Sequence, residues 1–171
     1  RRRPSSPLLP VMPSFGSIIV SNGNQFHRLN PTTGATIASI DLPDGFTNDI
    51  GLQILSADIP SLGGTLAPAG SLLITDGDAS TDKIFAVDPT DGTVIATLDL
   101  GVNIDPVAGV FHAARGTIFI MDFSPDEIHE VNPADGTFLN TFAAPFDINF
   151  GDLVVDPVTG NLLVVSDRVT R

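Results

Sequence analysis

Short apolar runs recur along this chain, each starting just after a glycine and ending near an asparagine or aspartate. The four copies lie at residues 16–22, 70–76, 116–122 and 160–167. Runs this short, rich in β-branched residues and bounded by turn-forming residues, predict buried β-strands rather than helices. The pattern therefore indicates an all-β protein.

A hairpin pattern follows the first three of these runs, at residues 26–40, 84–98 and 128–142, and the three copies align without a gap. In each copy, two apolar stretches flank a turn that opens with Asn or Asp, continues with Pro and closes with Gly. Proline presets φ at the second position, and glycine supplies the positive φ that closes the turn. We expect hairpin turns at residues 31–34, 89–92 and 133–136.

A third element, marked by glycine, precedes the later apolar runs at residues 50–55, 107–111 and 150–155. Glycine in a strand suits a crowded position where backbones approach closely. Each complete unit would then contain four antiparallel strands within about 40–50 residues, the period of a β-propeller blade.

The repeats divide the chain into a Pro-rich flexible lead-in, residues 1–15, and a partial β-propeller, residues 16–171. The units span approximately 16–45, 46–101, 102–145 and 146–171. Thirteen or so strands make about three and a half blades, fewer than the four to eight of a closed propeller. The expected fold is all-β, with β-propeller blades of four antiparallel strands and an incomplete ring in one chain.

Residues 101–110 and 115–122 carry a family resemblance. Their order of Gly101, Pro106, Gly109-Val110 and a turn at Gly116 before an apolar strand resembles the YVTN-type β-propeller repeat. The strand-end aspartates Asp76 and Asp122 are similar to those of the related NHL repeats. The resemblance implies a propeller architecture. Such families include bacterial surface-layer, periplasmic and other binding propellers as well as some enzymes, so the fold alone does not assign a function.

The balance of acidic and basic residues argues against nucleic acid as a partner. The formal net charge is −12, and three of the eight basic residues are Arg1, Arg2 and Arg3. Binding to phosphate backbones needs clustered Lys and Arg, so nucleic acid is a poor candidate partner. Aspartate makes up 18 of the 20 acidic residues, which favours turns.

The apolar segments give no membrane or export signal. No apolar run approaches the roughly 20 residues that span a bilayer, so we expect no membrane span. The N-terminal residues lack the apolar segment of a signal peptide. Cysteine is absent, which excludes disulfides and thiolate sites. From the acidic, lysine-poor composition we expect an extracellular or periplasmic location.

One segment has oxygen side chains at alternate positions, as a calcium loop does. Asp76, Asp78, Ser80 and Asp82 could wrap Ca²⁺, a cation that takes six to eight oxygen ligands. The EF-hand pattern fails at its twelfth position, which is Val87. Ordinary turn capping between two strands explains the same residues.

A second candidate site is axial. Asp49, Asp105, Asp147 and Asn149 lie just before the glycine-marked strands, which would line a propeller axis and converge on one mouth. Carboxylates gathered there would repel one another unless they shared a cation or a positively charged ligand. His112, on one of these strands, could also face the channel. The alternative is that all are solvated turn residues.

His27 and His129 occupy one repeat position, and Phe85 fills it in the middle copy. Interchange with phenylalanine predicts partly buried packing rather than catalysis. No Gly-x-Ser-x-Gly, HExxH or phosphate-loop motif occurs. We therefore expect a noncatalytic module for ligand or protein binding or assembly. The alternative is a fragment of a metal-dependent propeller hydrolase or lyase with an axial site.

An incomplete ring leaves sheet edges and faces that other strands can cover. Val154, Leu162 and Val164 would form an uncovered apolar face on the last unit. We expect a protein partner, or a second copy of the chain, to complete the propeller.

Overall fold

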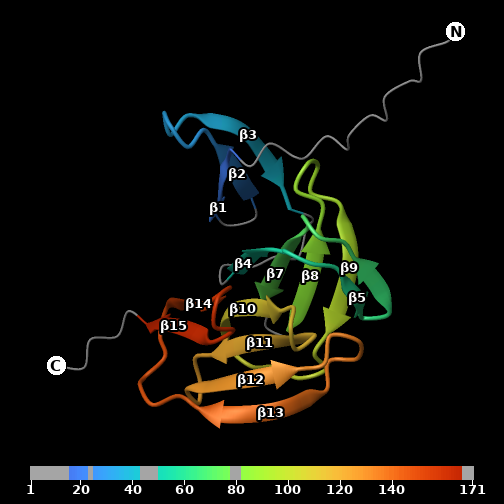
Figure 1. The fold of residues 1–171 in the computed structure, drawn as a ribbon, viewed down its shortest axis with the longest axis vertical. Coiled ribbons are helices and arrows are strands. Elements are labelled where there is room, and N and C mark those ends of the chain that lie inside the picture. Colours follow the sequence, from blue (N-terminus) through green and yellow to red (C-terminus); the bar gives the residue numbers. More distant parts are fainter. Residues whose placement is uncertain (1–15, 23–24, 43–49, 78–81, 167–171) are drawn as a thin grey trace, which may run out of the picture.

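The computed structural model describes residues 16–22, 25–42, 50–77 and 82–166, and these ranges form strands and turns without a helix (Figure 1). Within them, no helix is long or apolar enough to cross a membrane. The all-β prediction is confirmed. The strands are β1 (Ile18–Asn22), β2 (Gln25–Leu29), β3 (Thr36–Asp41), β4 (Ile50–Ile54), β5 (Ile59–Leu62), β6 (Thr65–Ala67), β7 (Leu72–Asp76), β8 (Lys83–Val87), β9 (Val94–Asp99), β10 (Pro106–His112), β11 (Thr117–Asp122), β12 (Glu127–Val131), β13 (Phe138–Ala143), β14 (Gly151–Val155) and β15 (Leu162–Ser166).

The strands form four consecutive antiparallel sheets and one inserted hairpin. The N-terminal sheet has the order β1-β2-β3, the second sheet β4-β7-β8-β9, the third sheet β10-β11-β12-β13, and the C-terminal sheet β14-β15. In each of the first three sheets, the last two strands are the predicted hairpin. Gly34, Gly92 and Gly136 close their turns with φ of 70°, 82° and 77°, which confirms the predicted turn chemistry.

The sheets follow one another along an open arc, in which the N-terminal and C-terminal sheets stand on either side of the opening (Figure 1). Strand β10 lies against β4 on one side and against β14 on the other. The approach is close, because a Cβ added to Gly51 would come within 2.8 Å of the Ala108 Cα. Glycine at this position thus allows the first strands of successive sheets to lie side by side.

Each pair of neighbouring sheets encloses its own apolar core. Phe26, Leu72 and Ile74 are buried between the N-terminal and second sheets. Leu73, Ile118 and Ile120 belong to the core between the second and third sheets, and Phe119 and Met121 to the core between the third and C-terminal sheets. Successive residues of one strand therefore pack against different neighbouring sheets, because side chains alternate between the two faces.

The hairpin β5–β6 is an insertion that the repeat pattern did not predict. Four strands were expected between residues 50 and 100, whereas the structure places six there. Ile59 and Leu62 bury their side chains in the core between the second and third sheets. The Gly63 N–H also donates to the Pro133 carbonyl over 2.9 Å, so the insertion ties the second sheet to the third.

The predicted apolar face of the last unit was wrong in two of its three residues. Val154 is directly opposite Leu163 in the β14–β15 ladder, so these two side chains share a face. Leu162 and Val164 point the other way and pack against the third sheet. The exposed face consists of Val154, Leu163 and Val165.

Candidate functional site

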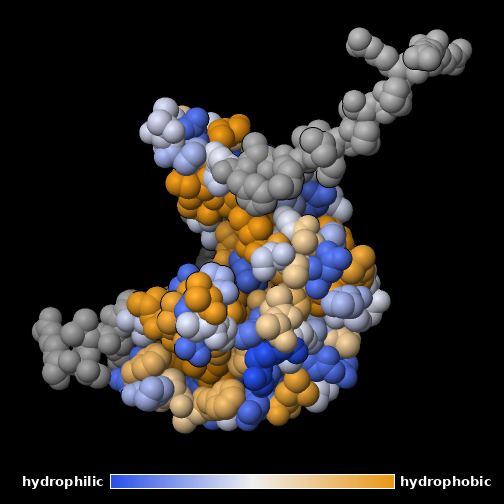
Figure 2. Space-filling model, viewed as in Figure 1, coloured by the Kyte–Doolittle hydropathy of each residue, from blue (hydrophilic) through white to orange (hydrophobic). Residues whose placement is uncertain are grey.

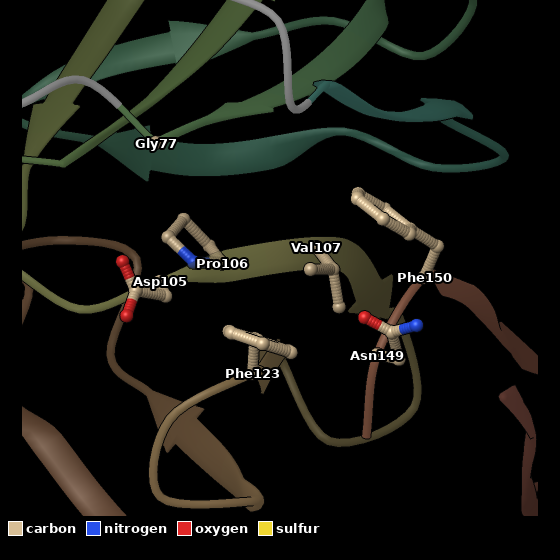
Figure 3. A pocket seen from close by; sticks show the side chains of 7 residues that line it. All are labelled: Gly77, Asp105, Pro106, Val107, Phe123, Asn149 and Phe150. Atoms are coloured by element: carbon tan, nitrogen blue, oxygen red, sulfur yellow. The ribbon is translucent and has the colours of Figure 1, made fainter. Parts of the chain in front are cut away.

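A pocket of about 230 Å³ lies where β10 and β14 begin (Figure 3). Three successive sheets contribute to it, because its lining residues follow β7, precede or begin β10, follow β11 and precede β14. These residues are Gly77, Asp105, Pro106, Val107, Phe123, Asn149 and Phe150. We refer to it as the strand-end pocket.

The walls of the strand-end pocket combine polar and apolar surface in similar amounts. Phe123 and Phe150 are large side chains that remain 42% and 60% exposed, and Pro106 and Val107 supply further carbon surface (Figure 3). The Asp105 carboxylate and the Asn149 amide are the polar side-chain groups of the lining. Aromatic side chains beside a few fixed polar groups are common in small-ligand sites.

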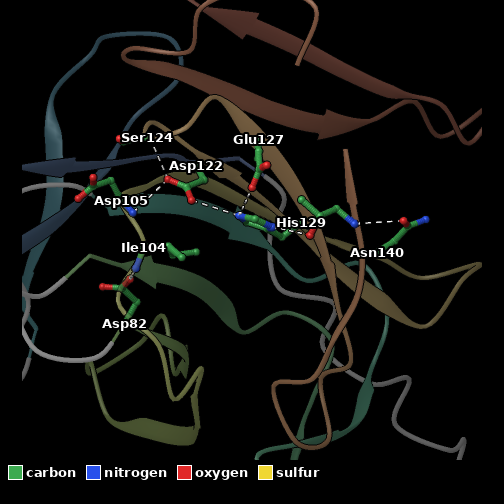
Figure 4. A network of polar contacts seen from close by, with 9 residues as sticks. Asp82, Ile104, Asp105, Asp122, Ser124, Glu127, His129 and Asn140 are labelled. Carbon is green, nitrogen blue, oxygen red and sulfur yellow. Dashed lines mark hydrogen bonds and ion pairs between the residues drawn. The ribbon is translucent and has the colours of Figure 1, made fainter. Parts of the chain in front are cut away.

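Hydrogen bonds from two sheets hold the segment that enters β10. The Ile104 N–H donates to Asp82 Oδ2 over 2.5 Å, and the Asp105 N–H donates to Asp122 Oδ1 over 3.1 Å (Figure 4). Asp82 precedes β8 of the second sheet, whereas Asp122 ends β11 of the third. The backbone of Asp105 is therefore fixed between the two sheets.

The same pair of hydrogen bonds, which we call a bracket, recurs one sheet later. The Ile148 N–H donates to Asp126 Oδ1 over 2.7 Å, and the Asn149 N–H donates to Ser166 Oγ over 3.2 Å. The separations in sequence are the same as in the first bracket, 22 and 17 residues. Asp105 and Asn149, the polar side chains of the strand-end pocket, thus project from two segments that equivalent hydrogen bonds hold in place.

Asp82 stands out among these anchors because its side chain is fully buried. Its Oδ1 has no hydrogen-bond partner among the residues that the structure describes, although Oδ2 accepts from the Ile104 N–H. The pKa of the Asp82 carboxyl is raised to about 6, chiefly by burial and also by the charges of Asp105, Asp122 and Asp76, against the lowering effect of the Ile104 N–H. Several carboxylates therefore act on one another beside the pocket, which gives this end of the sheets a negative potential.

His129 is part of the same polar network (Figure 4). Its Nε2 lies 3.1 Å from Asp122 Oδ2, its Nδ1 lies 3.0 Å from Thr141 Oγ1, and its ring packs on Phe138. The side chain is buried, which confirms a packing role and adds two hydrogen bonds to it. The network orients Asp122 and, through it, the backbone of Asp105.

The structure brings together two of the five predicted axial residues, Asp105 and Asn149, as neighbours in one pocket. Asp147 is close in sequence, and its carbonyl accepts from Ser166 Oγ over 2.9 Å, but it does not line the pocket. Asp49 lies outside the described residues. Two polar groups beside phenyl rings thus replace the expected ring of carboxylates among the residues that the structure describes.

His112 lies at the opposite end of β10 from Asp105. Its Nε2 is 2.9 Å from the Gly160 carbonyl oxygen, and its ring centroid is 6.0 Å from that of Phe119. The side chain is buried between the third and C-terminal sheets. The structure therefore separates His112 from the strand-end pocket.

Sequence reasoning missed Phe123 and Phe150, the two exposed rings of the pocket. Both occupy places where other repeats carry a smaller or conformationally special residue, since Gly77 corresponds to Phe123 and Pro106 to Phe150. A departure from the repeat toward an aromatic side chain at a strand end was the available signal.

The calcium loop remains a prediction. Asp76 and Asp82 are buried at either side of it, whereas Asp78 and Ser80 lie outside the described residues. Within the part of the chain that the structure describes, no three His, Asp or Glu side chains are arranged to hold a metal ion.

Comparison with known proteins yields a similarity of fold. No family model matches the chain, and no curated protein does. Among solved structures, the chain is similar to a protein of unknown function from Bacteroides caccae, with 16% identity and a TM-score of 0.50 over 85% of this chain. The match covers 63% of that protein, so the chain spans less than two thirds of its length.

Proposed function

We propose that this chain is a noncatalytic β-propeller module that binds a ligand in the strand-end pocket. The observation that carries the proposal is the pair of exposed phenyl rings, Phe123 and Phe150, beside the Asp105 carboxylate. Consecutive antiparallel sheets whose first strands lie side by side support the propeller arrangement. In such an arrangement, the strand-end pocket opens at the mouth of the axis.

The chemistry of the pocket favours a ligand with an apolar body and a positive charge. None of the lining residues that the structure describes is basic, and Asp105, Asp122 and Asp76 all act on the buried carboxyl of Asp82. A cation gains from the carboxylate and from the faces of aromatic rings, by about 0.5–1 kcal/mol per ring at exposed sites. The phenyl rings and Val107 would cover the apolar body.

A charge series of one molecular shape tests this function. The probes are phenethylamine, 2-phenylethanol and phenylacetate, which share a phenyl ring and differ in charge. We expect the amine to bind most tightly and phenylacetate most weakly, in titrations followed by amide chemical shifts. The shifts should centre on Asp105, Phe123, Asn149 and Phe150.

Two variants separate the pocket from general charge effects. Asp105→Asn should weaken amine binding by about fivefold, the equivalent of one exposed charge pair worth about 1 kcal/mol. The control is Asp91→Asn, in the exposed turn at the other end of β8, where the amide oxygen can still accept from the Thr93 N–H. Equal affinity for amine and alcohol, or equal loss in both variants, would refute the proposal.

A further inference from the structure

The three sheet-to-sheet junctions obey one packing rule. We call the face of a sheet that packs on the next sheet along the chain its forward face, and the opposite face its rear face. The second strands of the repeat are β1, β7, β11 and β15. At each junction, the residue at one position of this strand on the forward side shares an apolar core with two residues of the corresponding strand on the rear side, and at the third junction Met121 joins that core. The sets are Ile19 with Leu72 and Ile74, Leu73 with Ile118 and Ile120, and Phe119 with Leu162 and Val164.

The rear face of the N-terminal sheet has the same residues without a covering sheet. Ile18 and Val20 occupy the repeat positions of Ile118 and Ile120, which are completely buried. In the N-terminal sheet these side chains are 49% and 38% exposed. The sheet therefore presents an apolar face of the type that elsewhere packs on a forward face.

The forward face of the C-terminal sheet is exposed in the same way. Leu163 and Val165 occupy the repeat positions of Phe119 and Met121, which are buried in the core before the C-terminal sheet. Leu163 is 54% exposed and Val165 60%, with Val154 opposite Leu163 in the ladder. Among the residues that the structure describes, one forward face and one rear face thus have no sheet packed on them.

We infer that a second copy of this chain covers both faces by head-to-tail packing, so that two chains close one ring. The occupant follows from the packing rule, since every junction within the chain joins a forward face to a rear face. The two free faces are different surfaces, so the contact is heterologous and must either close into a ring or continue as a filament.

The shape of the chain favours closure. The sheets follow an arc rather than a straight stack (Figure 1), which favours a ring over a filament, and apolar side chains are visible on both end sheets in the space-filling view (Figure 2). Two chains of four sheets would supply eight, within the range of about four to eight blades that propellers use. The net charge of −12 on each copy opposes association, but salt screens exposed charges beyond about 8 Å.

Cross-linking tests the head-to-tail contact directly, because the chain contains no cysteine. Val20→Cys places a thiol on the rear face, and Leu163→Cys places one on the forward face. On mild oxidation, a mixture of the two variants should form a disulfide-linked pair, whereas each variant alone should not. The control thiol is Val158→Cys, at a turn position that is 89% exposed. Pairs formed by Val20→Cys alone or by Leu163→Cys alone, or a mixed yield no higher than the control, would overturn the inference.

Charge substitution tests closure in solution. The unsubstituted chain should have the mass of two 17.9 kDa chains by light scattering at tens of micromolar. Val20→Glu alone and Leu163→Glu alone should each be monomeric, since each removes one kind of face from every copy. Mixing the two should restore a two-chain particle, because one intact forward face then meets one intact rear face.

The outcomes of this second test are distinct. Far-UV circular dichroism of each variant establishes that the sheets are retained. A monomeric unsubstituted chain, or no recovery of mass on mixing two folded variants, contradicts the inference. Open species longer than two chains would overturn the two-chain ring.

Discussion

The internal sheets and the end sheets of this protein carry the same repeat but differ in what covers them. Ile118 in the third sheet and Ile18 in the N-terminal sheet occupy one repeat position, yet Ile118 is completely buried and Ile18 is about half exposed. The difference lies in the neighbours, because the second sheet covers Ile118 and none of the described sheets covers Ile18. The repeat therefore encodes a face for packing, and its burial depends on whether another sheet is present.

The largest expected contrast is between Ile118→Ala and Ile18→Ala. Truncating the buried isoleucine should lower the free energy of unfolding by about 3–4 kcal/mol, because it leaves a cavity. The same change at Ile18 should cost less than about 1 kcal/mol in the monomer, since half of the side chain already contacts water. Urea unfolding at submicromolar protein measures both values. Equal losses of unfolding free energy would mean that the position in the repeat, and not the covering sheet, sets the contribution of the side chain to stability.

The hairpin glycines give a second matched pair. Gly92 packs on the N-terminal sheet, where an added Cβ would lie 2.5 Å from the Asp41 carbonyl oxygen, whereas the surroundings of Gly34 are open. Both have positive φ, so alanine should cost about 1–2 kcal/mol at either position. Overpacking should raise the total loss for Gly92→Ala to about 3 kcal/mol. Thermal unfolding of the two variants would detect this difference, and identical melting temperatures would contradict it.

The repeated histidines extend the comparison to hydrogen bonds. His129→Phe would leave Asp122 Oδ2 and Thr141 Oγ1 without their buried imidazole partner, at a cost of about 1–3 kcal/mol. His27 has the Ser39 hydroxyl as a partner in a more exposed setting. We expect His27→Phe to cost less than about 1 kcal/mol, since Phe85 occupies the same position in the middle copy. Urea midpoints at fixed pH test the ranking.

The last comparison is between Asp82, whose bracket holds the start of β10, and Asp126, whose bracket holds the segment before β14. Here we expect the smallest effect on stability. The pKa of Asp82 is raised from 3.8 to about 6. Between these values the folded chain holds a proton that the unfolded chain has lost. The contribution of this group to stability is therefore full below about pH 4 and is lost as the pH rises through about 6.

The pH test uses the difference between a variant and the unsubstituted chain. Asp91, Asp135 and Asp156 have lowered pKa values because hydrogen bonds stabilise their charged forms, so their contributions change in the opposite direction, falling as the pH drops below about 4. The melting temperature of Asp82→Asn relative to the unsubstituted chain should rise from pH 4 to pH 7. Asp126→Asn is the matched control. A difference that stays constant with pH would show that Asp82 does not titrate in this range.

The sequence predicted the repeated elements well because their signals are local. Asn30, Pro31 and Gly34 define a turn by the backbone conformations and hydrogen bonds of neighbouring residues, and the other two copies repeat them. The hairpin β5–β6 was missed because its apolar residues, Ile59 and Leu62, match none of the repeated patterns. Their role depends on the core between the second and third sheets, which is formed by residues far apart in sequence.

The candidate site could be predicted in part. The sequence placed Asp105 and Asn149 before first strands, and the structure brings both into one pocket. It also assigned His112 to the same site, but β10 carries this side chain to its other end. Phe123 and Phe150 were not foreseen, because exposure of an aromatic side chain depends on what surrounds it.

By itself, the sequence determined the repeated strands, their turns and the alternation of side chains along each strand, because these follow from the conformational preferences of short segments. The tertiary structure decided which alternating set faces which neighbour, as the exchange of Leu162 and Val164 for Leu163 and Val165 on the exposed face shows. A shift of one residue in register moves every side chain to the other face. Only the packing of whole sheets selects between the two faces, because only burial of one of them separates the alternatives in free energy.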